Sequence, residues 1–228
     1  MTPTTPKSVW ELHHRLVAAY GPQIRLPEQH LGPLEELINT ILSQNTNDRN
    51  RDLAYARLRE QFPTWEAVRD APPEAVVTAI RPAGLAPSKA PRIQAALHQL
   101  TAEQGSLSLD FLADWTREEA RSWLLQLTGV GPKTAAIVLL FALDKPAFPV
   151  DTHIYRVTGR LGLLPPRTSR EQAHTLLESI VPEPLYYPLH LNLIEHGRQV
   201  CQARHPRCAA CPLTDLCLYF QKELSDEP

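Results

Sequence analysis

The spacing of apolar residues along the chain is helical almost throughout. Apolar positions recur every three or four residues, whereas the strict alternation typical of a half-exposed strand is nearly absent. Pro33, for instance, precedes a run whose apolar side chains would share one helical face: Leu34, Leu37, Ile38, Ile41 and Leu42. The pattern predicts an all-α protein.

Capping residues and prolines indicate where the helices begin. We expect Ser8 to cap a first helix that ends at about Tyr20. Further helices are predicted to start at Asn47, Thr64, Pro73, Pro87, Ser108 and Thr116, and a last group to cover 132–143, 152–161, 169–180 and about 187–200. Many short helices joined by turns favour a helical array with a cleft over a long-helix bundle.

Composition limits the class of protein. The 228 residues are 43% hydrophobic, enough for one large domain or two small ones. The net charge of −2 means that any surface for nucleic acid must be local. The longest apolar run, 135–143, is too short to span a membrane, and the N-terminus lacks the pattern of a secretory signal. We therefore expect a cytoplasmic protein that does not contact a membrane.

A Gly-x-Gly turn lies between two predicted helices. Gly129 and Gly131 would leave backbone N–H groups open at the start of the second helix, where the helix dipole favours an anion such as a DNA phosphate. A plain helix–loop–helix turn is the alternative. Lys133 in the first helical turn favours a catalytic site over a plain turn. The positive end of the helix dipole lowers the pKa of an amine, and a neutral amine is a nucleophile. A solvated surface lysine is the alternative for this side chain.

A second polar group follows the hairpin in the sequence. Asp151 precedes a predicted helix, where a structural N-cap is the simplest role. If it faced Lys133, its carboxylate would stabilise a sugar cation or relay protons to and from the amine. We expect His153, one turn later, to play a supporting role through a phosphate contact or through packing.

All four cysteines lie near the C-terminus, at Cys201, Cys208, Cys211 and Cys217. Disulfides are improbable in a cytosolic chain, so the spacing indicates a shared metal centre. Because only one pair is close and the whole set spans a single short loop, a [4Fe–4S] cluster is favoured over zinc. Arg204 and Arg207 make this loop a local source of positive charge. It is either a DNA-binding surface or an ordinary solvated loop.

These motifs resemble the endonuclease III family of the helix-hairpin-helix DNA glycosylases. The family's L-P-G-V-G-x-K-T-A hairpin, V-D-T-H-x-x-R-V segment and C-x6-C-x2-C-x5-C loop correspond to 127–135, 150–157 and 201–217. The resemblance extends over nearly the full chain. It implies two helical domains flanking a DNA-binding cleft: a six-helix barrel over 26–143, and an iron–sulfur domain that joins 1–25 to 144–228, with Lys133 on one wall and Asp151 on the other.

The resemblance also implies a function and the residues for it. Lys133 matches the catalytic lysine, which attacks the sugar of a flipped damaged nucleotide and then cleaves the strand 3′ to the abasic site; Asp151 matches the essential carboxylate. The cysteines match the ligands of a structural [4Fe–4S] cluster. Leu85 and either Gln44 or Asn45 match the residues that fill the space left by the flipped base, although Leu85 can also be explained as a plug beside Gly84.

The sequence departs from the family pattern at three positions near the lysine. Thr128 replaces the usual Pro, Pro132 replaces a basic residue, and Leu125 stands where some relatives carry Glu. The expected protein is thus a monomeric base excision repair enzyme for oxidised pyrimidines in double-stranded DNA, associated with the nucleoid. The alternatives are a monofunctional glycosylase for mispaired or alkylated bases, which Lys133 disfavours, and a catalytically weak DNA-binding iron–sulfur protein.

Overall fold

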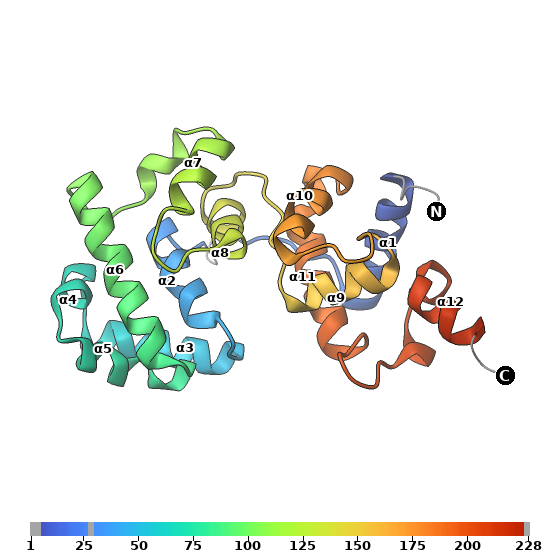
Figure 1. Cartoon of the computed structure of the whole chain (residues 1–228), viewed down its shortest axis with the longest axis horizontal. Helices are drawn as coiled ribbons and strands as arrows, with labels where there is room; N and C mark the ends of the chain where they lie inside the picture. The colour runs from blue at the N-terminus through green and yellow to red at the C-terminus, as the bar shows by residue number, and fades with distance from the viewer. Residues whose placement is uncertain (1–5, 27–29, 226–228) are drawn as a thin grey trace. The chain divides into compact units, whose positions relative to one another are not determined.

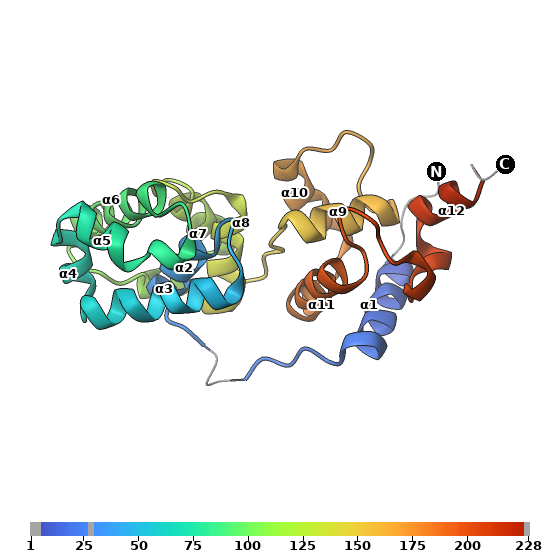
Figure 2. The same ribbon diagram turned by 90° about the horizontal axis from the view of Figure 1, so that it is seen from below.

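The computed structural model describes residues 6–26 and 30–225, and every regular element in those ranges is a helix (Figures 1 and 2). The all-α prediction is confirmed. Across the same ranges, no helix has the length and apolar character needed to cross a bilayer. The chain divides into two compact units: residues 30–145 form one, and residues 1–29 together with 146–228 form the other.

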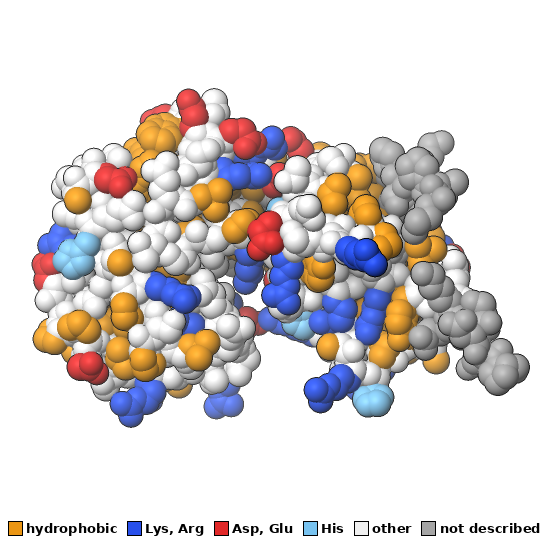
Figure 3. Space-filling model, viewed as in Figure 1, with side chains coloured by type: hydrophobic (Ala, Val, Ile, Leu, Met, Phe, Trp, Pro, Cys, Tyr) orange, Lys and Arg blue, Asp and Glu red, His pale blue; other side chains and the backbone are white. Residues whose placement is uncertain are grey.

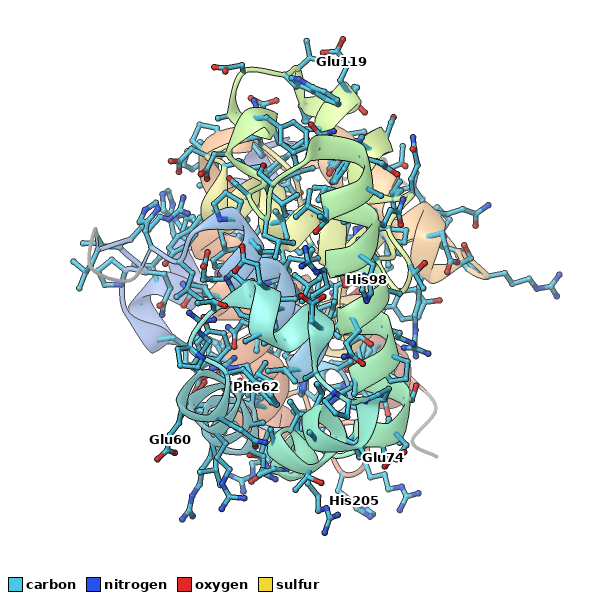
Figure 4. All side chains as sticks on the ribbon, turned by 90° about the vertical axis from the view of Figure 1, so that its left-hand side faces the viewer. Glu60, Phe62, Glu74, His98, Glu119 and His205 are labelled. Carbon is cyan, nitrogen blue, oxygen red and sulfur yellow. The ribbon has the colours of Figure 1, made fainter. Side chains whose placement is uncertain are left out.

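The unit of residues 30–145 is built around α2 (Pro33–Ser43). This helix buries Leu34, Leu37, Ile38, Ile41 and Leu42, and it packs against α3 (Asp48–Gln61), α6 (Ala86–Gln104) and α8 (Pro132–Ile137). The shorter α4 (Trp65–Asp70) and α5 (Pro73–Ala79) pack on α6. Figure 4 looks onto this unit, with Phe62 just after α3, Glu74 in the first turn of α5 and His98 on α6.

The hairpin helices complete this unit. A 3-10 turn, η2 (Arg81–Ala83), connects α5 to α6, and a second, η3 (Asp110–Ala113), leads into α7 (Arg117–Leu124). After the hairpin, α8 continues directly into a π-helical segment, η4 (Val138–Ala142), which buries Val138, Leu139 and Leu140. The continuation keeps 132–142 helical and anchors the start of α8 to the core.

The other unit is centred on α11 (Tyr186–Gln199), which packs against α1 (Pro6–Tyr20) and α9 (Thr152–Leu161). The remaining helices of this unit are α10 (Arg170–Ile180), η5 (Glu183–Leu185), η6 (Cys208–Ala210), η7 (Thr214–Leu216) and α12 (Leu218–Ser225). Because α12 packs on α9, the segment after the last cysteine returns to the helix that follows Asp151. Residues far apart in the sequence therefore meet around α9.

Most helix starts lie where capping predicted them. Asn47, Thr64, Thr116 and Ser169 each accept a backbone N–H bond at the start of their helices, and Pro73 is the first residue of α5. The prediction of a helix from Ser108 was wrong: the Ser108 and Asp110 side chains bond to each other, and only the 3-10 turn η3 follows. The first helix already begins at Pro6, so Ser8 lies inside it.

Candidate functional site

The Gly-x-Gly turn forms the hairpin between α7 and α8. Gly129 adopts φ +84°, and the carbonyl of Leu127 accepts a hydrogen bond from the Val130 N–H at 3.1 Å. A Cβ placed on Gly129 would lie 2.9 Å from Cδ of Arg92, whereas one on Gly131 would meet nothing within 4 Å. Gly131 is the extended N-cap of α8. Only Gly129 therefore requires glycine for the turn itself.

Lys133 lies in the first turn of α8 and is half-buried. The next three residues, 134–136, are buried, so the helix that carries the amine is fixed in the core. Pro132 occupies the first helical position, where a missing N–H breaks no helical bond. This placement explains why the hairpin accommodates a proline beside the lysine. Leu125, at the end of α7, is 41% exposed and adds no charge there.

The two loops matched to the base-flipping residues lie in the same unit as Lys133. Leu85 precedes α6 with φ +51° and is 58% exposed, so it is not a core plug. Asn45 follows α2 with φ +52° and is exposed. Gln44 is half-buried, and its Oε1 accepts a hydrogen bond from Nη1 of Arg92 at 3.4 Å. Of the two amides, Asn45 is the one presented to solvent at the loop tip.

Asp151 lies in the other unit, at the start of α9. Its Oδ1 accepts a 2.7 Å hydrogen bond from the Ile154 N–H, so the structural N-cap is present. The preceding backbone is held by buried histidines: His174 hydrogen-bonds with the Phe148 carbonyl at 3.1 Å and His190 with the Pro149 carbonyl at 2.9 Å. These contacts fix the segment from which the carboxylate projects. These contacts could not be predicted from local sequence, because the bonded residues are 26 and 41 positions apart.

His153 has a packing role in this structure. Its side chain contacts Gly197 of α11, where a Cβ would lie 2.8 Å from Cβ of His153. Its Nδ1 hydrogen-bonds with Arg156 at 3.1 Å. Arg156 also donates to the carbonyls of Gly197 and Cys201, both at 2.9 Å. Arg156 thereby connects α9 to the start of the cysteine loop. The sequence motif that contains Asp151 includes this arginine but does not indicate its role.

The four cysteines line one cavity, together with residues of α9, α11 and α12. Among the described residues, no three His, Cys, Asp or Glu side chains are grouped to hold a single metal ion. Four thiols around one mostly apolar cavity fit a polynuclear cluster, in which each iron takes its own thiolate. Burial lowers the pKa of His196 to about 4, so a neutral ring lies 3.7 Å from Sγ of Cys211.

One arginine lines this cavity, and two more lie on the cysteine loop. Arg160 of α9 donates to Sγ of Cys201 at 3.3 Å and to the Gln202 carbonyl at 2.7 Å, and its guanidinium lies over the Tyr219 ring. Arg204 and Arg207 are exposed on the loop. Figure 3 shows Lys and Arg side chains gathered on this unit, on the face turned to the viewer. Sequence reasoning identified the loop arginines but missed Arg160.

Comparisons with known proteins agree with these features. Residues 38–183 match the family model described as HhH-GPD superfamily base excision DNA repair protein, and residues 201–217 match the iron-sulfur binding domain of endonuclease III. The second match confirms the predicted [4Fe–4S] centre.

Individual relatives extend the likeness. The chain is 38% identical over 165 residues to a putative DNA glycosylase of Arabidopsis thaliana. The aligned region covers 72% of this chain but only 56% of that protein. It is 35% identical over 200 residues to endonuclease III of Thermotoga maritima, covering 87% and 89% of the two chains. A solved structure of a trapped endonuclease III–DNA covalent intermediate superimposes with a TM-score of 0.80 at 30% identity, covering 97% of this chain and 99% of that one.

Proposed function

Since the chain belongs to the HhH-GPD superfamily of base excision DNA repair proteins, we propose that it is a bifunctional DNA glycosylase and abasic-site lyase that removes oxidised pyrimidines from double-stranded DNA. The main support for this proposal is the position of Lys133, which lies in the first turn of α8, directly after the Gly129–Gly131 turn. The likeness to a trapped covalent protein–DNA intermediate supports a covalent mechanism.

In this mechanism Nζ of Lys133 attacks C1′ of the damaged nucleotide's deoxyribose. The N-glycosidic bond breaks, and the base leaves with the bonding electron pair and takes up a proton. The sugar ring opens to a Schiff base, a proton is lost from C2′, and the C3′–O bond breaks, which cuts the strand on the 3′ side. Water then hydrolyses the imine and releases the lysine.

Asp151 accepts and donates protons in these steps. One carboxylate oxygen, Oδ1, accepts the cap bond from Ile154, and we assign the second oxygen to proton exchange with the amine and to stabilising the sugar cation. The hydrogen bonds of His174 and His190 to the preceding carbonyls limit the movement of this carboxylate. A fixed carboxylate needs little reorganisation when charge develops on the sugar.

The DNA contacts follow from exposure and backbone geometry. The N–H groups of Gly129 and Gly131 bind a phosphate, and Arg204 and Arg207 bind the backbone through charge alone. Leu85 and Asn45 fill the space left by the flipped base, because both are exposed at loop tips while Gln44 bonds to Arg92. The protein is assigned as a monomer of the cytoplasm, acting on the nucleoid.

Cys201, Cys208, Cys211 and Cys217 hold the [4Fe–4S] cluster, which supplies structural crosslinking of the loop when bound. No step of base removal passes through it. Arg156 and Arg160 connect the loop to α9, so the loop's order and the position of the Asp151 segment depend on the same helix.

Borohydride trapping tests the function. The protein is incubated with a duplex carrying thymine glycol or an abasic site and is then reduced, which converts a Schiff base to a stable amine. The wild type and a Lys145→Ala control should form a covalent adduct, and Lys133→Ala should form none. Base release without strand cleavage or adduct would instead show a monofunctional glycosylase, and duplex binding without any turnover would show loss of catalysis.

A further inference from the structure

Lys89 is a buried lysine that the mechanism does not use. It lies in the first turns of α6, four residues after Leu85, and only 1% of it is exposed. Lysine is among the residues most rarely buried, because removing its charge from water is costly. A position that keeps a lysine in the core needs contacts that compensate for this cost.

The compensating contacts are two backbone carbonyls at the ends of two separate helices. Nζ of Lys89 donates to the Leu42 carbonyl at 2.7 Å and to the Ala83 carbonyl at 2.9 Å. Leu42 lies in the last turn of α2, and Ala83 ends the 3-10 turn η2. Carbonyls at a helix end lack helical partners and carry partial negative charge, which a cation satisfies. One ammonium group therefore caps two helix ends at once.

The capped carbonyls directly precede the two loop tips. Asn45 follows Leu42 by three residues, and Leu85 follows Ala83 by two. Both tip residues adopt left-handed backbone conformations, with φ +52° and +51°. Leucine is disfavoured in this conformation, so the surrounding contacts must hold it there. Burial also lowers the pKa of Lys89 to about 8, in keeping with an amine enclosed by protein.

A second contact from α6 joins the same loops to the hairpin. The side-chain stem of Arg92 lies against Gly129, and its guanidinium reaches Oε1 of Gln44. Lys89 and Arg92 lie three residues apart, so they project from neighbouring positions on α6. The start of α6 thus contacts the loop after α2, the turn before α6 and the hairpin that leads to Lys133.

We propose that Lys89 is a positioning residue that clamps the Asn45 and Leu85 loops to one another, so that both tips enter the duplex together when a damaged base is flipped out. This inference rests on the proposed function and on the gap-filling roles of the two tips. Lys89 does not touch the reacting atoms. It acts through Asn45 and Leu85, and its loss should impair base extrusion before it impairs chemistry at the sugar.

Lys89→Met tests the clamp, because methionine keeps an apolar stem without the donor. Single-turnover base release is measured on a thymine glycol duplex, and 2-aminopurine beside the lesion reports extrusion. We expect base release and the extrusion signal to fall about tenfold or more, while borohydride trapping on a preformed abasic site stays within about threefold. Lys145→Met is the matched control: Lys145 also donates to two carbonyls, those of Ala113 and Trp115, and should retain both activities.

A double-mutant cycle separates positioning from general destabilisation. If Lys89 acts through Leu85, the loss caused by Lys89→Met should largely disappear in a Leu85→Ala background. Unchanged base release and extrusion in Lys89→Met, equal losses in both assays, or additive losses in the cycle would overturn the proposal. If Lys89→Met does not fold, Lys89→Gln, which retains a shorter donor, is judged by the same criteria. Absence of trapping in the wild type would instead refute the proposed function.

Discussion

At the scale of single residues, a substitution at Leu85 should reduce base release with little effect on the free energy of unfolding. Its left-handed backbone costs roughly 1–2 kcal/mol for a residue with a Cβ, and its exposed side chain gains little from packing. Leu85→Gly should relieve that strain, offset by about 0.5–1 kcal/mol of chain entropy. We therefore expect the free energy of unfolding to stay within about 1 kcal/mol of the parent while base release falls. A clear loss of stability with normal base release would show that Leu85 serves the core.

A second prediction at the residue scale is that Lys89 makes the free energy of unfolding depend on pH. Burial lowers the pKa of Lys89 from its ordinary value of 10.5 to about 8 in the folded chain. Below pH 8 both states are protonated, and the cost of burying the charge is fully present. Between 8 and 10.5 the unfolded state binds more protons, so folding becomes more favourable as pH rises, by about 3 kcal/mol in total.

Comparison with Lys89→Met isolates this contribution. The unfolding free energy of the wild type minus that of the variant should rise as the pH is taken from below 8 to above 10.5. Denaturant titrations at several pH values give this difference. A difference that stays flat or falls across that interval would contradict the burial of a charged amine at this position.

At the scale of elements, the hairpin requires glycine at one of its two glycine positions. Gly129→Ala would strain a φ of +84° and push against Arg92, so we expect a loss of about 1–3 kcal/mol in unfolding free energy. Gly131→Ala is the matched comparison, because its backbone is extended and a Cβ there meets nothing within 4 Å. Thermal unfolding of the two variants measures the contrast, and equal losses would refute this account of the turn.

Helix starts were predictable where a local signal determines them. Asn47, Thr64, Thr116 and Ser169 form caps with residues three positions later, so the pattern is contained in a few residues. The helix predicted over 132–143 is present, but the π-helical geometry of 138–142 had no such signal, and neither did the helix α12. The π segment buries its apolar residues in the core, and α12 packs on α9, so both depend on contacts distant in sequence. Local patterns cannot specify them.

At the scale of the whole molecule, the sequence motifs predict candidate reactive groups but not the contacts that support them. Lys133, Asp151 and the four cysteines are predicted from residue type and spacing. The groups that support two of these sites, His174 and His190 before Asp151 and Arg160 at the cysteine loop, bond to partners remote in sequence. Their roles follow from tertiary structure alone. Support of this kind is what converts a motif into a defined site.

The two units should respond differently to loss of the cluster. Cys211→Ser removes one ligand, so the visible absorbance of the cluster should fall and the loop of 201–217 should become sensitive to protease. The unit of residues 30–145 has its own core around α2 and should keep its amide protection in hydrogen exchange. Equal loss of protection in both units would show that they do not fold independently.

Above all, we expect the amine of Lys133 to form the covalent bond to DNA. The most direct measurement is peptide mapping by mass spectrometry after borohydride reduction of the wild-type protein with an abasic-site duplex. We expect a sugar-modified peptide containing Lys133, with Lys89 and Lys145 unmodified. A modification on another amine, or strand cleavage with no modified peptide, would contradict it.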